Sequence, residues 1–461
     1  MSTYLGGSAL DYGRNVAVDS AGYIYIAGFT LSSDFPVTAG TYDTTHNGGL
    51  DIFLLKLTPA GDQLVFSTFV GGSGNDAPWA MAVSDDGAIY LAGDTQSTNF
   101  PVTAGAFDTS HNGGFEDAFI LKMTADGSGL LYSTYLGGTG WDIATALVPD
   151  GNGAVYISGE TWSNAFPSTP DAYDATYNGQ ADVFATRLNA DGSDLLYSTY
   201  LGGAGIENPN DIALANGGEV TITGRTASAN FPTTASAFDQ TYGGDYDAFV
   251  TQFNTAGDSL VYSTYLGAEG YEEGRGVASD GGDNATVTGF TGSAAFPTTA
   301  GAYDVTYNGN PYDVYVTRLS ADGSGLIYST FLGGNNEDRG LALALDALGK
   351  TYVTGYTLSV DFPTTTAAGA SGYYQKLFVA SFSQDGRSLG FSTVMGGNGL
   401  SGAVDIVVPH VGDVYVTGNT DAADFPTSAG TYDTSYNGLT DAFALRLLLA
   451  QKRLYLPSIL Q

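Results

Sequence analysis

The 461-residue sequence contains no cysteine, which excludes disulfides, thiolate nucleophiles and zinc–thiolate centres. It is also poor in positive charge, with 14 Lys and Arg against 48 Asp and Glu, for a net charge of −34. This balance argues against a nucleic-acid partner and against anionic lipid surfaces. No run of about 18 apolar residues occurs, so no membrane span is expected. No signal peptide is visible.

The residues that are abundant indicate a folded protein with a large core. Gly occurs 65 times, and aromatic residues make up 13% of the chain. Enough aromatic and β-branched side chains are present to fill a core, so a disordered chain is not expected.

The sequence repeats itself seven times, with spacings between 63 and 66 residues. A fixed period of this kind indicates one structural unit used again and again. The word that marks the period is found as STYLGG at 2–7, STFVGG at 67–72, STYLGG at 133–138 and 198–203, STYLGA at 263–268, STFLGG at 329–334 and STVMGG at 392–397. Because the sequence begins inside a repeated word, we expect a processed or trimmed form of a longer chain.

Each unit contains four short strand-like segments, here named a, b, c and d in chain order. In the third unit these are 144–150, 154–162, 182–189 and 194–203. Glycine-rich turns between a and b and between c and d predict hairpins, and a Pro/Gly/Asn/Asp-rich loop of about 20 residues joins b to c. Seven such units predict an all-β, seven-bladed β-propeller of four-stranded antiparallel blades. A β-solenoid is the alternative.

Several words, STYLGG, G-x-T-x-S-x-x-FP and DAF, recur in one order along nearly the whole chain. In this the sequence resembles the bacterial seven-bladed β-propeller (SBBP) repeat family. The resemblance implies a propeller fold and a secreted or cell-surface bacterial setting. It implies little about activity, because such repeats are generally not assigned a reaction.

We expect one propeller domain over residues 1–461, with the N-terminal strand at 2–7 completing the last blade. A tail at 450–461 has no repeat word, and it offers a second strand-like segment that competes for the same edge or pairs with another molecule. The expected blades are 8–72, 73–138, 139–203, 204–268, 269–334, 335–397, and 398–449 together with 2–7.

Positions that are alike in every unit are interpreted as serving the blade itself. The repeated Phe-Pro pair is expected to hold the b–c loop against its blade. His46 and His111 stand where other units have Tyr, so they are interpreted as aromatic substitutes. The third histidine, His410, falls in the last a–b turn, and no catalytic triad or zinc site is supported.

Two sets of acidic residues recur, and they could either cap turns or bind a metal ion. The first follows the GG word by four residues, and only the seventh unit departs from it, with Ser401: Asp11, Asp76, Asp142, Glu207, Glu272 and Asp338. The second is a pair of acids in the b–c loop, and only the sixth unit departs from it, with Lys376 in place of the second acid: Asp43/Asp51, Asp108/Asp117, Asp174/Asp182, Asp239/Asp247, Asp304/Asp313 and Asp433/Asp441. Capping of turns is the favoured interpretation. No metal or cofactor is assigned, but Ca²⁺ binding by these oxygens stays open.

Two positions vary from one repeat to the next and are therefore the candidate ligand-binding residues. Both are expected near the mouth of the central channel, on the face of the d–a and b–c loops. The first is the middle residue of G-x-T at the end of strand b: Phe29, Asp94, Glu160, Arg225, Phe290, Tyr356 and Asn419. The second lies seven residues after GG: Arg14, Trp79, Thr145, Asn210, Arg275, Leu341 and Val404. Thr145, Leu341 and Val404 complete this second set without being assigned a ligand contact.

Three functions are consistent with these residues. The first is a non-catalytic binding or scaffold module, secreted or at the cell surface, for a glycan or a protein. The second is an extracellular lyase or glycosidase at the channel mouth that uses Asp94, Glu160 and Arg225. The third is a structural subunit that assembles through its terminal strands.

Overall fold

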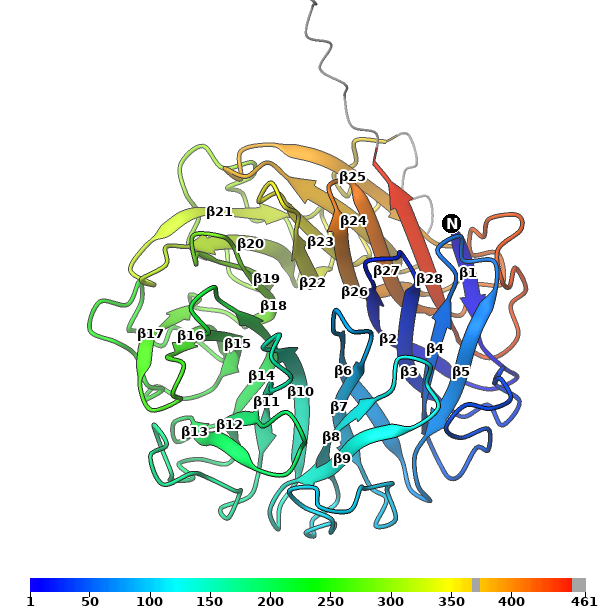
Figure 1. The fold of residues 1–461 in the computed structure, drawn as a ribbon. Helices are drawn as coiled ribbons and strands as arrows, with labels where there is room; N and C mark the ends of the chain where they lie inside the picture. The colour runs from blue at the N-terminus through cyan, green and yellow to red at the C-terminus, as the bar shows by residue number, and fades with distance from the viewer. Residues whose placement is uncertain (367–373, 450–461) are drawn as a thin grey trace, which may run out of the picture.

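The computed structural model describes residues 1–366 and 374–449, which form a ring of seven four-stranded antiparallel sheets (Figure 1). No helix occurs in these two ranges. The predicted all-β, seven-bladed propeller is therefore confirmed. Residues 450–461, on which the expectation of a competing tail strand rests, lie outside the described part.

Each blade uses four strands that follow one another along the chain, except that the last blade takes its outer strand from the N-terminus. Blades 1 to 4 consist of β2 (Asp11–Val18), β3 (Ile24–Thr30), β4 (Asp51–Leu57) and β5 (Leu64–Val70); β6 (Asp76–Val83), β7 (Ile89–Thr95), β8 (Asp117–Met123) and β9 (Leu130–Leu136); β10 (Asp142–Pro149), β11 (Val155–Thr161), β12 (Asp182–Leu188) and β13 (Leu195–Leu201); and β14 (Glu207–Leu214), β15 (Val220–Thr226), β16 (Asp247–Phe253) and β17 (Leu260–Leu266). Blades 5 to 7 consist of β18 (Glu272–Ser279), β19 (Ala285–Thr291), β20 (Asp313–Leu319) and β21 (Leu326–Leu332); β22 (Asp338–Leu345), β23 (Thr351–Thr357), β24 (Lys376–Phe382) and β25 (Leu389–Met395); and β26 (Ser401–His410), β27 (Asp413–Thr420), β28 (Asp441–Leu448) and β1 (Ser2–Leu5).

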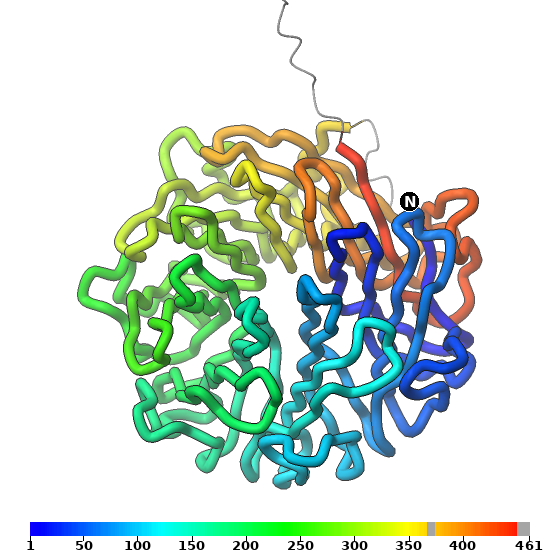
Figure 2. The backbone as a smooth tube through the Cα atoms, in the orientation of Figure 1, coloured from blue at the N-terminus to red at the C-terminus, as the bar shows by residue number. Residues whose placement is uncertain are grey.

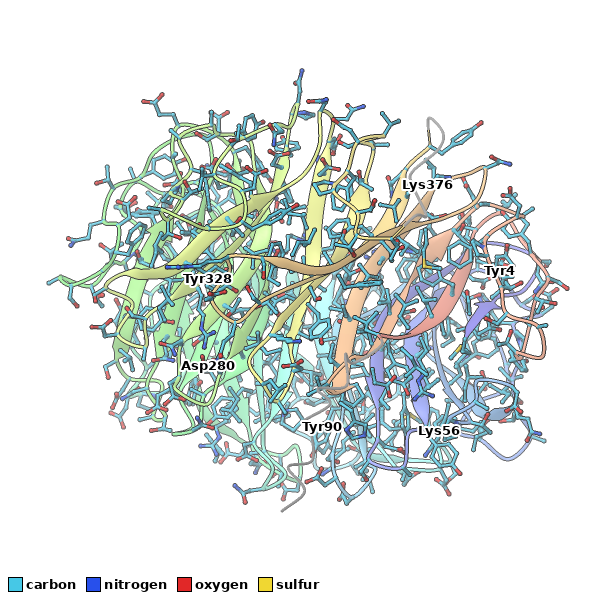
Figure 3. The ribbon with its side chains drawn as sticks, turned by 90° about the horizontal axis from the view of Figure 1, so that it is seen from above. Tyr4, Lys56, Tyr90, Asp280, Tyr328 and Lys376 are labelled. Atoms are coloured by element: carbon cyan, nitrogen blue, oxygen red, sulfur yellow. The ribbon has the colours of Figure 1, made fainter. Side chains whose placement is uncertain are left out.

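The first strand of every blade surrounds the central channel, and the fourth lies at the periphery (Figure 1). The loops before strands a and c then gather on one face of the ring, and the short hairpins gather on the other. Figure 3 shows this separation, because Lys376 at the start of β24 lies near one face while Lys56 and Asp280 lie near the other.

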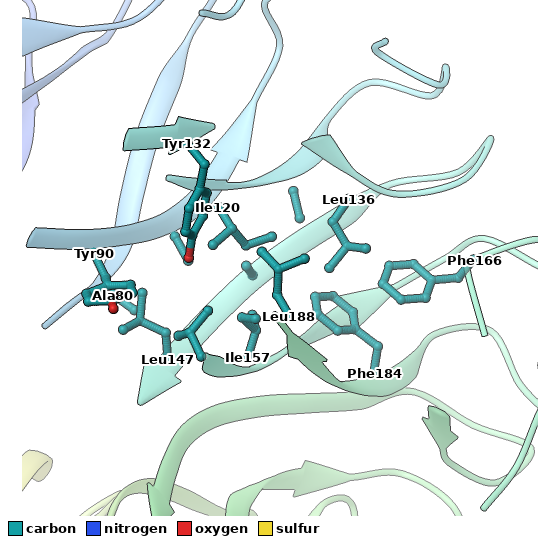
Figure 4. Packing of buried hydrophobic residues seen from close by; sticks show 14 of the residues in the cluster. Ala80, Tyr90, Ile120, Tyr132, Leu136, Leu147, Ile157, Phe166, Phe184 and Leu188 are labelled. Atoms are coloured by element: carbon teal, nitrogen blue, oxygen red, sulfur yellow. The ribbon is translucent and has the colours of Figure 1, made fainter. Parts of the chain in front are cut away.

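The hydrophobic core is a set of seven clusters, one between each pair of neighbouring blades. In the cluster of Figure 4, Ile120 and Leu136 of blade 2 pack with Ile157 and Phe184 of blade 3. Strands in this position are covered on both faces, which explains their nearly continuous apolar sequences. Burial between blades, rather than within one blade, holds the ring together.

The ring is closed by pairing of its two ends. β1 pairs antiparallel with β28, with Thr3 opposite Ala444 and Leu5 opposite Ala442. Tyr4 is buried, and its hydroxyl donates to the Ala422 carbonyl over 2.8 Å. Figure 2 shows the N-terminus beside the last strand. The prediction that the first strand completes the last blade is confirmed.

The repeated Phe-Pro and GG words have structural roles. Phe35 is buried and stacks on Phe53 of β4 with ring centroids 4.4 Å apart, which holds the b–c loop of blade 1 against its sheet. Asp76 accepts hydrogen bonds from the Gly72 amide and from the Ser97 hydroxyl. This bonding fixes the d–a turn, as predicted for the first set of acids.

Candidate binding site at the channel mouth

A cavity of about 370 Å³ lies in the channel and is lined by residues from the innermost strand of all seven blades. Such a volume is in the range of small-ligand sites. Because every blade contributes, the chemistry of the lining is set by positions at which the repeats differ.

A β-bulge interrupts the pairing of strands a and b at the same place in every blade. In blade 2, for example, the register shifts between Pro78 and Ala80, which leaves Trp79 unpaired. Bulges re-aim a side chain and are frequent beside binding sites. The seven bulged residues all line the cavity: Arg14, Trp79, Thr145, Asn210, Arg275, Leu341 and Val404. These are the seven residues that the spacing from GG selects.

Arg14 reaches the cavity without a carboxylate partner. Its guanidinium lies 4.2 Å from the ring centroid of Trp79 and 5.2 Å from that of Phe29. Its Nε is buried without a hydrogen-bond partner, and no ion pair to it occurs within residues 1–366 and 374–449. Burial lowers the pKa of Arg14 to about 10, and the charge of Arg275 adds to this effect. A cation in this state favours an incoming anion.

Asp94 lies directly behind Trp79, whose indole Nε1 donates a hydrogen bond to its Oδ1. Asp94 is buried. Burial raises the pKa of Asp94 to about 7, and the nearby charge of Glu116 raises it further. The carboxyl group therefore orients Trp79 in either protonation state and changes its charge near neutral pH.

Glu160 lines the cavity beside blade 4. It accepts hydrogen bonds from the indole of Trp162 and from the side-chain amide of Asn208. Burial raises the pKa of Glu160. The Asn208 oxygen in turn accepts from Nε of Arg225 over 3.0 Å, so Arg225 lies one residue behind the cavity wall.

Glu273 joins two of the candidate arginines. Its carboxylate lies 2.9 Å from Nη1 of Arg275 and 3.3 Å from Nη1 of Arg225. Asn210 also donates to Glu273 over 3.1 Å and accepts from Arg275 over 3.1 Å. These contacts fix Arg275 and Asn210 in the cavity wall before any ligand arrives.

The remaining predicted residues lie around the cavity and not in its lining. Phe29 stacks on Tyr12 with centroids 5.1 Å apart, and Phe290 stacks on Tyr271 at 5.8 Å. The hydroxyl of Tyr356 donates to Glu337 over 2.9 Å. Asn419 pairs opposite Gly402 at the start of the last blade. The structure thus brings Arg14, Trp79, Glu160, Asn210 and Arg275 together at one cavity and places the other candidates behind or beside them.

Two acids in the cavity were missed from the sequence. Asp211 and Asp405 each follow a bulged residue and line the cavity. Their side chains accept backbone N–H groups of the next blade, from Val277 over 2.7 Å and from Val16 over 2.8 Å. Burial raises the pKa of Asp211 to about 7 and that of Asp405 to about 6. Other repeats have Asn, Ala or Gly at this position, a difference that marks it as variable.

Three exposed aromatic side chains were also missed. Phe115, Trp141 and Trp162 are 56%, 50% and 38% exposed, and their ring centroids follow one another at 5.8 and 6.1 Å. Large aromatic rings exposed side by side are uncommon on a soluble surface and indicate an interaction site. Because Trp162 is bonded to Glu160, this aromatic row extends the cavity onto the loop face.

The fold and the cavity define the class of protein: a seven-bladed β-propeller with a ligand-sized site in its central channel. The resemblance to the SBBP family is confirmed, because the family model described as a β-propeller repeat matches residues 2–36. Among the described residues, no helix has the length and apolar character needed to cross a bilayer.

The chain is similar to the regulatory protein FlaEY of Caulobacter vibrioides, with 26% identity over 340 residues. This match covers 70% of the chain but 33% of FlaEY, so the chain spans about a third of that relative's length.

Two solved structures are similar to the chain at low sequence identity. The polysaccharide lyase Uly1 superposes with a TM-score of 0.51 at 10% identity, covering 96% of this chain and 90% of that one. A protein of unknown function from Dyadobacter fermentans DSM 18053 gives a TM-score of 0.45 at 10% identity, covering 97% and 98%. At these identities the likeness concerns the fold alone.

Proposed function

We propose that this propeller is a non-catalytic binding module, secreted or held at a bacterial cell surface, whose ligand binds at the channel mouth. One observation carries the proposal. Seven bulges aim seven side chains into one cavity, and these side chains are of six different kinds in the seven blades, whereas the blade around them is built from repeated words. A purely structural position would repeat as the rest of the blade does.

The ligand class that fits best is a glycan that carries carboxylate groups. The aromatic row of Phe115, Trp141 and Trp162 offers flat apolar faces with polar edges, which suit sugar rings. Arg14 offers an unpaired guanidinium, and planar guanidinium groups bind carboxylates through two parallel hydrogen bonds. The net charge of −34 repels polyanions elsewhere on the surface, so binding is expected at the mouth alone.

The repeats themselves supply suitable variants for a test. Because Leu and Thr occupy the bulge in blades 6 and 3, Arg14→Leu and Trp79→Thr place side chains there that this fold already accepts. Leu131→Ala, on the exposed side of β9, is the matched control far from the channel. Of the three tryptophans, Trp79 lines the cavity, and Trp162 and Trp141 form the aromatic row beside Glu160, so intrinsic fluorescence reports on the site without a label.

Glycan and peptide arrays would identify binders, and each would then be titrated by tryptophan fluorescence. We expect carboxylated oligosaccharides to bind, with affinity at least about tenfold weaker in Arg14→Leu and Trp79→Thr and unchanged in Leu131→Ala. Binding of peptides only would make the ligand a protein. Cleavage of the bound oligosaccharide, seen by mass spectrometry, would replace the binding proposal with the lyase or glycosidase alternative. Binding that survives both mouth variants would contradict the site.

A further inference from the structure

Pairs of buried carboxylates lie between neighbouring blades. The acid that begins strand c of one blade faces the acid that begins strand a of the next, and each pair interacts electrostatically. All twelve residues are 0% exposed. The pairs are Asp51 with Asp76, Asp117 with Asp142, Asp182 with Glu207, Asp247 with Glu272, Asp313 with Asp338, and Asp441 with Asp11. Two like charges out of water require a compensating positive group.

In five of the six pairs the acid that begins strand c has one oxygen without a hydrogen-bond partner, whereas Oδ1 of Asp441 accepts from the Gly438 amide over 3.1 Å. Asp51 uses its Oδ2 to accept from the Asn47 amide, while its Oδ1 is buried with no hydrogen bond. The corresponding Oδ1 atoms in the next four blades are also unpartnered: Asp117, Asp182, Asp247 and Asp313. Within the described ranges, the ion pairs of these twelve acids are limited to one histidine contact, 3.7 Å from His111 to Asp117. An unpartnered buried carboxylate oxygen indicates a missing ligand.

The oxygens of each pair point at one place beside the first glycine of the GG word. A Cβ added to Gly71 would lie 2.9 Å from Oδ2 of Asp76 and 3.0 Å from Oδ1 of Asp51. The same construction at Gly137 gives 2.9 Å to Asp142 and 3.1 Å to Asp117. The absence of a side chain therefore leaves a space bordered by both carboxylates.

At the remaining junction, between blades 6 and 7, both acids of the pair are replaced; it is called the seventh junction below. Lys376 stands at the start of β24 where the other blades have Asp, and its counterpart in blade 7 is Ser401. A Cβ added to Gly396 would lie 2.8 Å from Cδ of Lys376 and 3.2 Å from Oγ of Ser401, so these two residues border the same space. Lys376 is buried, and its ammonium group donates to the Gly397 carbonyl. Where the two carboxylates are lost, the chain supplies a cation of its own.

We infer that each of the six carboxylate pairs binds a hard divalent cation, Ca²⁺ by its preference for oxygen ligands, at the place that the Lys376 side chain borders between blades 6 and 7. The ligands from the chain at the first junction are Oδ1 of Asp51 and Oδ2 of Asp76. One divalent ion neutralises the two charges of each pair. This inference concerns the junctions between blades and is independent of the ligand at the channel mouth.

Metal content and stability test the inference directly. The chain would be stripped with a chelator, dialysed against Ca²⁺ at pH 8 and measured by plasma mass spectrometry, and thermal unfolding would be followed with and without Ca²⁺. We expect about six bound ions per chain and a higher unfolding temperature in Ca²⁺, because an ion bound by the folded state alone stabilises it. Less than one ion per chain, with an unfolding temperature that depends on pH and not on Ca²⁺, would show that the pairs share protons and would overturn the inference.

The seventh junction also supplies a matched pair of variants. Asp51→Lys together with Asp76→Ser copies Lys376 and Ser401, and should reduce the bound Ca²⁺ by about one ion in a ring that still folds. Lys376→Asp together with Ser401→Asp builds the common pair at the last junction and should add about one ion. Because the second variant gains a site, it remains informative where the first fails to fold. Unchanged metal content in both variants would count against the inference.

Discussion

The first glycine of the repeated GG word is needed because neighbouring carboxylates leave no room for a Cβ. Its backbone conformation does not require glycine. Gly71 has no left-handed conformation, yet a Cβ there would meet two carboxylate oxygens at 2.9 and 3.0 Å. The sequence alone indicated a turn after an outer strand. It did not indicate why the turn begins with glycine, because the two carboxylates come from different blades.

Replacing Gly71 with alanine is therefore expected to destabilise the chain by about 1–3 kcal/mol, because the carboxylate pair has to move. The measurement is the free energy of unfolding in denaturant. Gly129→Ala is the matched control, since a Cβ there meets nothing within 4 Å, and it should change stability by less than about 1 kcal/mol. Equal effects of the two substitutions would show that the space beside Gly71 tolerates a methyl group.

Asp211 is expected to make stability depend on pH. Its pKa is raised by burial from 3.8 to about 7 in the folded chain. A raised folded-state pKa contributes stability that is fully present below pH 3.8 and is lost as the pH rises through 7. Unfolding free energies between pH 5 and 8 should therefore fall more steeply in the natural chain than in Asp211→Asn, by on the order of 2 kcal/mol. Parallel curves would mean that Asp211 does not titrate in this range.

At the scale of the strand, the bulge is the feature that turns a repeated scaffold into a specific site. The position seven residues after the GG word is the bulged position in every blade, although the local sequence does not predict a bulge. The residue after each bulge was not selected, and Asp211 and Asp405 were missed for that reason. Alternation along a strand predicts which face a side chain takes, whereas an unpaired residue interrupts that alternation.

Deleting a bulged residue should remove its side chain from the cavity without shifting the register of strands a and b. Ala144 pairs with Gly159 and Ala146 pairs with Ser158, so a chain without Thr145 can continue the ladder of β10 and β11 with the same partners. We expect both the deletion and Thr145→Ala to cost less than about 3 kcal/mol. Chemical denaturation of both variants provides the comparison, and a much larger loss on deletion would show that the ring needs the bend that the bulge introduces.

Long-range relations between blades were the part of the molecule that the sequence did not reveal. The strands and loops were predictable because their patterns are local. Lys376 and Ser401 were each noticed as a departure from a repeat, but their positions are 25 residues apart and belong to different blades. Only the folded ring shows that the two departures occur at one place.

For the whole molecule, closure by β1 is expected to carry a large share of the stability. Tyr4 and Leu5 are each 1% exposed, and loss of two such side chains costs about 5 kcal/mol or more. A chain without residues 2–7 should melt at a clearly lower temperature in calorimetry. A synthetic peptide of sequence STYLGG, added in excess, should restore part of the loss. An unchanged melting temperature in the shortened chain would show that closure is dispensable.

The pairing of β1 with β28 also affects synthesis. Ser2 and Asp441, which begin the two strands, are separated by most of the chain, so β1 leaves the ribosome roughly half a minute or more before its partner exists. During that interval β1 has no strand to pair with, while the blades that follow it fold one by one. Two chains made side by side can then exchange these strands, each closing the ring of the other. Crowded polysomes are therefore expected to produce swapped dimers, and slow, dilute expression to produce closed monomers.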